Sequence, residues 1–130
     1  MSIALNHTIV AARDKKASAQ FLADILGLEV SPQYGPFIPV QIPNGVTLDY
    51  MDTDTAAPIT PQHYAFLVSE ADFDEILARV QESGLTYWAD PFHRIVNEIN
   101  TNDGGRGAYF DDPNGHNLEI LTRPYGSGTD

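Results

Sequence analysis

The stretch Gly107–Leu121, with the sequence GAYFDDPNGHNLEIL, predicts a β-hairpin whose second strand carries an acid inside an apolar run. Its Asp-Pro-Asn-Gly segment is typical of a tight turn, because proline presets φ while Asn and Gly tolerate positive φ. Strand alternation places Leu118 and Ile120 on one face and Glu119 on the other. An isolated ionised carboxylate among apolar neighbours is costly unless it is paired, protonated or bound to a metal. Glu119 is therefore expected to have a partner elsewhere in the chain.

Composition and charge limit the classes of function. The 130 residues are 42% hydrophobic, which is enough for one compact domain with its own core. A net charge of −11 disfavours nucleic acid and anionic membrane surfaces as partners. The chain has no cysteine, which excludes disulfides and thiolate metal ligands. No signal peptide or membrane-spanning segment is recognisable, so we expect a cytoplasmic protein.

The chain is an internal duplication. A strand over 3–12 contains His7, and the helix after it is expected to end at Gly27, which lies 20 residues beyond His7. A strand over 62–68 contains His63, and its helix is expected to end at Gly84, which lies 21 residues beyond His63. Asp14 and Ser69 are the expected N-caps of the two helices.

Three strands follow the helix in each half, including a short one at 28–30 and an edge strand at 37–42 that contains a proline. The sequence thus predicts an α+β fold of two βαβββ modules. Module one covers residues 1–54, a polar linker 55–60, module two 61–123, and a mobile tail 124–130.

Acids occupy matching positions in the last strand of each module. Asp49 lies 42 residues after His7, and Glu119 lies 56 residues after His63. Two imidazoles and one carboxylate, His7, His63 and Glu119, are a donor set for Zn, Ni, Mn, Co or Fe(II) that leaves positions open for substrate. Asp49 is shorter than Glu by one bond of about 1.5 Å, which makes direct ligation less expected than for Glu119, and two roles stay open for it, a fourth ligand or a catalytic base. The alternative is that the histidines are ordinary hydrogen-bonded strand residues and the acids cap loops.

The repeated pattern and the motif Gly-x-x-Tyr-Phe-x-Asp-Pro-x-Gly-His-x-x-Glu resemble the vicinal oxygen chelate superfamily. This group includes glyoxalase I, extradiol dioxygenases, fosfomycin-modifying enzymes and bleomycin-binding proteins. The resemblance implies two βαβββ modules that form a curved mixed sheet around a metal-binding cavity, usually in a homodimer. It assigns His7, His63 and Glu119 to the metal triad. Tyr109 matches a substrate-contacting tyrosine of the fosfomycin-modifying branch and is a catalytic candidate beside Asp49.

Three positions depart from the patterns of particular branches. Ile9 stands where the fosfomycin-modifying branch has Thr, and Ala11 where bacterial glyoxalase I has an arginine that holds glutathione. Asp49 stands where glyoxalase has a ligating Glu. The resemblance therefore indicates the fold more specifically than the reaction.

A long loop over 90–106 supplies further substrate-binding candidates, because long loops within a compact domain often form lids or binding surfaces. We expect substrate to contact His93 and Arg94 of this loop, together with Trp88, which precedes the loop, and Tyr109, which follows it. Arg94 or Arg106 suits an anionic group, which guanidinium holds in bidentate fashion, although a solvated arginine is the alternative. His116 in the turn is expected to be structural or exposed.

The expected function is a metal-dependent enzyme for a substrate with adjacent oxygens. Proton abstraction beside a carbonyl, as in lyases and isomerases, is the first choice, and extradiol-type oxygenation is the second. A non-catalytic drug- or metabolite-binding protein of the same fold is the third.

Assembly gives the first testable prediction. Each module exposes edge strands that need covering, and related proteins commonly pair through them. We expect a homodimer at micromolar concentration, measured as mass by light scattering. A mass near the 14.3 kDa of one chain would contradict this expectation.

Overall fold

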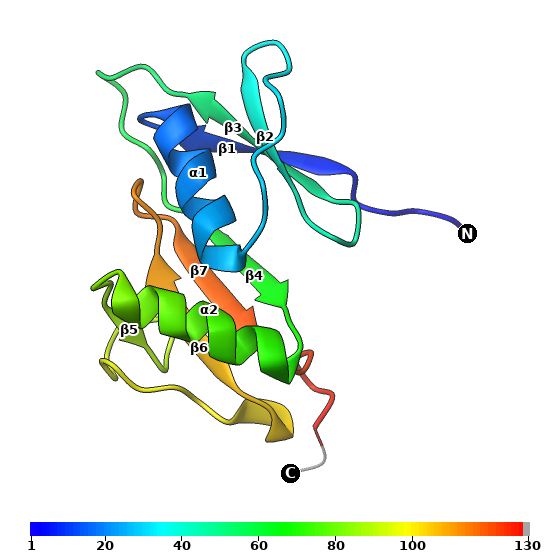
Figure 1. The fold of residues 1–130 in the computed structure, drawn as a ribbon, viewed down its shortest axis with the longest axis vertical. Coiled ribbons are helices and arrows are strands. Elements are labelled where there is room, and N and C mark those ends of the chain that lie inside the picture. Colours follow the sequence, from blue (N-terminus) through cyan, green and yellow to red (C-terminus); the bar gives the residue numbers. More distant parts are fainter. Residues whose placement is uncertain (129–130) are drawn as a thin grey trace. The chain divides into compact units, whose positions relative to one another are not determined.

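The computed structural model describes residues 1–128 and separates into two compact units, one from Met1 to Thr60 and one from Pro61 onward (Figure 1). Each unit contains one α-helix of three turns or more and one mixed sheet, so the predicted α+β class is confirmed. Over residues 1–128, none of the helices is long and apolar enough to cross a membrane.

The first unit contains the strands β1 (His7–Ala12), β2 (Phe37–Gln41) and β3 (Thr47–Asp52) and the helix α1 (Lys15–Leu26). The strand order is β1-β3-β2, with β1 and β3 parallel and β2 antiparallel to β3. Strand β2, which contains Pro39, is at the edge of the sheet as predicted. Helix α1 contacts all three strands and covers one face of the sheet. The core between them consists of Val10, Ala12, Ala19, Leu22, Ala23, Ile25, Ile38, Val40, Leu48 and Tyr50.

The ends of α1 confirm the sequence signals. The side chain of Asp14 accepts hydrogen bonds from the backbone N–H groups of Lys16 and Ala17. Gly27 ends the helix at φ 74°, a left-handed conformation that glycine adopts without a steric penalty.

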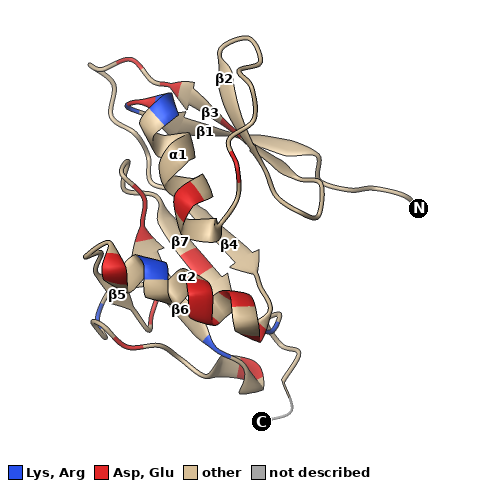
Figure 2. Cartoon of the chain, in the orientation of Figure 1, with Lys and Arg blue, Asp and Glu red and all other residues tan. Residues whose placement is uncertain are grey.

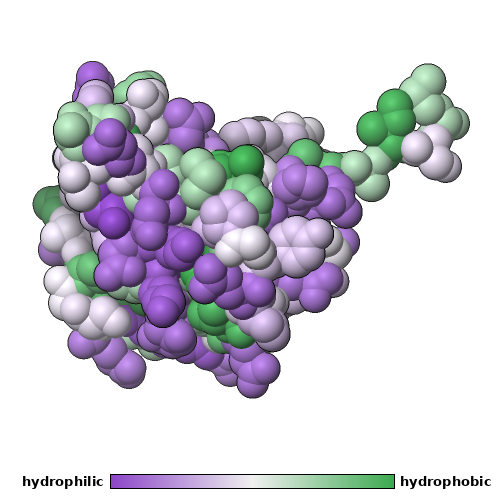
Figure 3. All heavy atoms as spheres, turned by 90° about the horizontal axis from the view of Figure 1, so that it is seen from above, coloured by the Kyte–Doolittle hydropathy of each residue, from purple (hydrophilic) through white to green (hydrophobic). Residues whose placement is uncertain are grey.

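Two expectations for this unit were wrong. No strand forms over 28–30, where Val30 makes only an isolated bridge to Val40, because the N–H of Leu28 donates to Ala23 O at the end of α1 and the N–H of Ile42 donates to Val46 O. The first strand begins at His7 rather than at residue 3, because its partner β3 begins at Thr47, which pairs with His7. Residues 1–6 instead form an extended arm whose Ile3 and Leu5 side chains are exposed, and Figure 3 shows the hydrophobic character of this arm.

The second unit contains the helix α2 (Glu70–Glu82), the short turn η1 (Asn102–Gly104) and four strands: β4 (His63–Leu67), β5 (Tyr87–Trp88), β6 (Gly107–Asp111) and β7 (Asn117–Leu121). The strand order is β4-β7-β6-β5, and only β4 and β7 are parallel. Ser69 caps α2 as predicted, accepting from the N–H of Asp72. The core of this unit consists of Phe73, Ile76 and Val80 of α2 and of Ala108, Phe110, Leu118 and Ile120 of the sheet.

The register of β4, β6 and β7 places the functional candidates on the other sheet face. Glu119 pairs with Tyr109 on one side and with Ala65 on the other, and Tyr109 pairs with Trp88. His63 lies two residues before Ala65 on the same face. The first unit repeats this relation, because Asp49 pairs with Ile9, two residues after His7.

Arg106 connects the start of β6 to α2. Its Nε donates to Glu70 Oε1 at 2.7 Å and its Nη1 to Asp74 Oδ1 at 2.8 Å, while the guanidinium lies 4.5 Å from the centre of the Phe73 ring. Hydrogen bonds from Thr122 and then from Arg106 lower the pKa of the Glu70 carboxyl. Figure 2 shows how few basic residues stand among the acidic ones. The suggestion that Arg106 receives an anionic substrate group is therefore not supported, since these acids already pair with it.

The hairpin that carries Tyr109 and Glu119 depends on Asp112, which gives the second prediction. Asp112 Oδ1 accepts from the N–H groups of Asn114 and His116, both at 2.8 Å, and His116 is buried. Asp112→Ala leaves a buried donor unpaired, so the free energy of unfolding should fall by about 1–3 kcal/mol in urea titrations.

Asp54 offers a matched control, because it makes the same kind of bond, to the N–H of Ala56, on an exposed turn. Asp54→Ala should change the free energy of unfolding by no more than about 0.5 kcal/mol. Equal losses in the two variants would refute the role given to Asp112.

Candidate metal centre

His63 and Glu119 are in contact on the open face of the second sheet. His63 Nε2 lies 3.1 Å from Glu119 Oε1, and the Glu119 side chain is 2% exposed against 44% for His63. The pairing of β4 with β7 produces this contact, because both side chains point from neighbouring parallel strands to the same face. Glu119 is thus the buried member of the pair, and His63 is the member open to a ligand.

The tautomer of His63 shows whether this pair fits a metal. His63 Nδ1 lies 2.9 Å from the backbone oxygen of Asn117, which only accepts, so Nδ1 carries the hydrogen. In a neutral imidazole Nε2 is then an acceptor, and it faces a carboxylate oxygen, which is also an acceptor. Two acceptors at this distance need a proton or a cation between them. Metal-ligating histidines characteristically donate their other ring N–H in this way, so the pair fits a divalent ion.

Two tyrosines surround the Glu119 carboxylate. The Tyr125 hydroxyl donates to Oε1 at 2.6 Å and to Oε2 at 2.8 Å. The Tyr109 hydroxyl lies 3.1 Å from the Tyr125 oxygen and donates to it, since the Tyr125 proton is already directed to Glu119. Burial, more than any other cause, raises the pKa of Tyr109, so this phenol keeps its proton at neutral pH. The Tyr109 ring also stacks on His63, with 6.0 Å between ring centres.

Trp88 and His93 form a flat pair beside this centre. Their rings are parallel within 4° and 3.7 Å apart. His93 Nε2 lies 3.4 Å from Asn117 Oδ1 and 3.5 Å from Asp111 Oδ1. The backbone of His93 has φ 58°, a left-handed conformation that is uncommon outside glycine and often occurs at functional sites. Asn117 thus connects this pair to the imidazole of His63.

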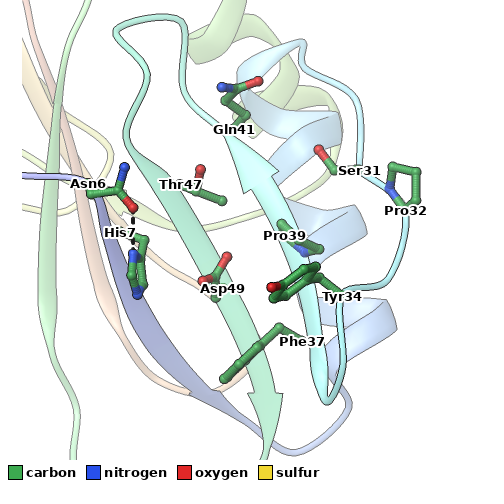
Figure 4. Close-up of a pocket in the computed structure, with 10 residues that line it drawn as sticks. All are labelled: Asn6, His7, Ser31, Pro32, Tyr34, Phe37, Pro39, Gln41, Thr47 and Asp49. Carbon is green, nitrogen blue, oxygen red and sulfur yellow. Dashed lines mark hydrogen bonds between the residues drawn. The ribbon is translucent and has the colours of Figure 1, made fainter.

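The first unit contains a pocket of about 550 Å³ that includes His7 and Asp49 (Figure 4). His7 Nδ1 donates to Asn6 Oδ1 at 2.7 Å, which leaves Nε2 as an acceptor in the neutral ring, as in His63. Asp49 is half-buried on the same sheet face. The aromatic rings of Tyr34 and Phe37 line the pocket, and its other lining residues are Asn6, Ser31, Pro32, Pro39, Gln41 and Thr47.

The predicted triad is divided between the units, with His7 in the first and His63 and Glu119 in the second. Within each unit, taken over residues 1–128, there is no group of three or more His, Asp and Glu side chains that could hold a metal ion. Tyr109, Trp88 and His93 lie in the second unit with the His63–Glu119 pair, whereas Asp49 lies with His7. The triad and the division of roles remain predictions.

Two further candidates have other surroundings. The guanidinium of Arg94 lies 5.4 Å from the ring centre of exposed Phe92, and its backbone N–H donates to Asp90 Oδ1. His116 is buried, and its Nδ1 accepts from the N–H of Gln62 at 3.0 Å, which is the structural role that we expected.

Sequence reasoning missed three residues that orient the site. Asn6 and Asn117 hold the two imidazoles. Asn6 directly precedes His7, whereas Asn117 pairs with His63 in the β4–β7 ladder, so strand register could have identified Asn117. Tyr125 lies in the tail that we expected to be mobile from residue 124. Residues 123–128 make hydrogen bonds, among them Gly128 N to Asp103 Oδ1, while residues 129 and 130 of that tail lie outside the described residues.

Comparison with known proteins agrees with this fold and motif. Residues 4–120 match the Glyoxalase/Bleomycin resistance protein/Dioxygenase superfamily. The chain belongs to this superfamily. The sequence is 31% identical over 122 residues to "Glutathione transferase FosA" of Serratia marcescens, covering 89% of this chain and 78% of that protein.

Two solved structures are more similar to this chain. "Oxidase ChaP-H2" is 78% identical with a TM-score of 0.96, covering 99% of this chain and 100% of the other. "Oxidase ChaP-H1" is 61% identical with a TM-score of 0.92, covering 96% and 99%. The resemblance inferred from the hairpin motif is thereby confirmed.

The different surroundings of Glu119 and Asp49 give the third prediction. Glu119→Gln keeps the size of the side chain and removes its charge, so metal affinity should fall at least about 10-fold, the scale at which even outer-shell partners act. Asp49→Asn should leave affinity within a few-fold if Asp49 is a base and not a ligand. Calorimetric titration with Zn²⁺ or Co²⁺ measures both.

An exposed acid on α2 serves as the control, and Glu82→Gln should leave metal affinity unchanged. Equal losses in the Glu119 and Asp49 variants would make Asp49 a fourth ligand. Undiminished binding by Glu119→Gln would remove the basis for the metal centre.

Proposed function

We propose that this protein is a divalent-metal-dependent enzyme for a small molecule with adjacent oxygen atoms, and that His7, His63 and Glu119 hold the metal. The observation that carries this proposal is the His63–Glu119 pair, whose facing acceptor atoms are 3.1 Å apart. The ion, Zn, Ni, Mn, Co or Fe(II), would supply positive charge that binds the adjacent oxygens and stabilises negative charge as it develops.

The chain's own side chains would orient the substrate and move protons. Tyr109 is a neutral phenol next to Glu119 and can donate a hydrogen bond to a substrate oxygen. The stacked rings of Trp88 and His93 offer a flat apolar surface beside it. Asp49 lies with His7 at the pocket of the first unit, where a half-buried carboxylate can accept a proton.

Oxidation of the substrate by dioxygen, a class that includes extradiol-type ring cleavage, is the reaction that we favour. Two relatives that are 78% and 61% identical to this chain carry the name oxidase, which supports the extradiol-type alternative over proton abstraction. Proton abstraction is the second candidate, favoured by the position of Asp49 near His7. Transfer of glutathione, as in the name of the more distant relative, is not proposed, because Ile9 replaces the threonine of that branch.

Oxygen consumption gives the fourth prediction. Protein loaded with Fe(II) or Mn(II) is mixed under air with a panel of catechols, α-hydroxyketones and vicinal dicarbonyls. We expect uptake of dioxygen with at least one class, measured with an oxygen electrode. Tyr109→Phe should lower the rate about 100-fold or more if the phenol transfers a proton, while Glu82→Gln should leave it unchanged.

The other outcomes distinguish the alternatives. Exchange of a substrate C–H with deuterated water under nitrogen, without oxygen uptake, would contradict oxidation and support proton abstraction. Tight binding without any turnover, in protein that contains no divalent metal and gains no stability from one, would identify a drug- or metabolite-binding protein.

A further inference from the structure

The Tyr125 hydroxyl occupies the space between the two oxygens of Glu119. Its distances to Oε1 and Oε2 are 2.6 and 2.8 Å, so a single O–H is shared by both acceptors. This is also where an ion chelated by both carboxylate oxygens would lie. The hydroxyl and such an ion exclude one another.

The shorter of these hydrogen bonds is made to the oxygen that faces the metal-binding imidazole. Oε1 is 2.6 Å from Tyr125 and 3.1 Å from His63 Nε2. A residue that only supported Glu119 from behind would be expected to bond to Oε2, which is not the oxygen facing His63. Tyr125 instead makes its shorter hydrogen bond to Oε1, the oxygen beside which the ion is expected.

The segment Arg123–Gly128, which we call the strap, lies against the second unit, where the side chain of Arg123 packs beside Gly105 and the backbone of Gly128 beside Asp103. Arg123 Nη2 donates to Ser127 O, Ser127 Oγ donates to Pro124 O, and Gly128 N donates to Asp103 Oδ1. The first two of these bonds lie within the strap itself. The Tyr125 side chain is exposed, and Gly126 has φ 76°, a left-handed conformation that glycine adopts without a steric penalty. Because the Tyr125 side chain is already exposed, little of its surface is newly exposed when its hydroxyl leaves Glu119.

We propose that Tyr125 competes with a divalent ion for Glu119, so that the strap must release the carboxylate before the ion binds. This rests on the proposed metal site and adds the residue that sets its affinity. The buried carboxylate of Glu119 needs a hydrogen-bond donor or a cation beside it in every state. In the ion-free state the Tyr125 hydroxyl is that donor, and in the ion-bound state the cation replaces it. Tyr109 assists, because its hydroxyl donates to the Tyr125 oxygen.

Tyr125→Phe tests this proposal by removing the hydroxyl while keeping the ring, and it is the fifth prediction. A hydrogen bond to a charged group is lost only by the competing state, so affinity for Zn²⁺ or Co²⁺ should rise about 10-fold or more in calorimetric titrations. Tyr87→Phe is the control, since Tyr87 lies in the same sheet and its hydroxyl accepts from Gln81. Its affinity should equal that of the unchanged protein.

Each other result contradicts the proposal in a recognisable way. Equal affinity in Tyr125→Phe and the unchanged protein would overturn the competition and leave the metal site intact. Weaker binding by Tyr125→Phe would show that the hydroxyl supports the ligand instead of competing with the ion. Absence of metal binding in both proteins would overturn the proposed site together with the strap.

The unchanged protein provides a second measurement. Chymotrypsin cuts after tyrosine, so release of the strap should speed cleavage between Tyr125 and Gly126 when Zn²⁺ is added. The product that ends at Tyr125 is quantified by mass spectrometry, with cleavage after exposed Phe92 as the internal reference. A rate of cleavage at Tyr125 that does not respond to the ion would contradict the proposal.

Discussion

The buried carboxylate of Glu119 is the constraint around which the second unit is arranged. Its residue is 1% exposed on a sheet face opposite the apolar core, where an unpartnered charge would be prohibitively costly. Tyr125 and His63 approach its oxygens, and Tyr109 supports Tyr125. The central proposal, that a divalent ion is the partner of this arrangement, rests on the tautomer of His63, whose Nε2 faces Glu119 Oε1 at 3.1 Å.

The duplicated architecture explains why an acid and a histidine meet at all. In each unit the first and last strands are parallel neighbours, and the acid pairs with the residue two positions after the histidine. The same register therefore places Asp49 on the sheet face of His7 in one unit and brings Glu119 into contact with His63 in the other. The units differ in what surrounds the acid, since Asp49 opens to a pocket of about 550 Å³ while Glu119 is enclosed by tyrosines.

Local signals in the sequence accounted for most elements, because caps, turn residues and alternation act over a few positions. Asp14, Gly27, Ser69 and the hairpin turn all behaved as their chemistry predicts. The strand expected at 28–30 failed because pairing needs free partners as well as β propensity, and the N–H groups of Leu28 and Ile42 bond to Ala23 and Val46 instead. Tyr125 was beyond sequence reasoning, since contact between a glycine-rich tail and Glu119 depends on the path of the loop and has no periodicity.

The most direct test of the central claim is X-ray absorption at the zinc edge of protein loaded with one equivalent of Zn²⁺. The account predicts a first shell of nitrogen and oxygen donors with the multiple-scattering signature of two imidazoles, at about 2.0–2.1 Å. In the Glu119→Gln variant, the spectrum of the fraction of Zn²⁺ that still binds should keep the two-imidazole signature. A first shell without imidazole, or with a single one, would contradict the claim that His7 and His63 hold the same ion.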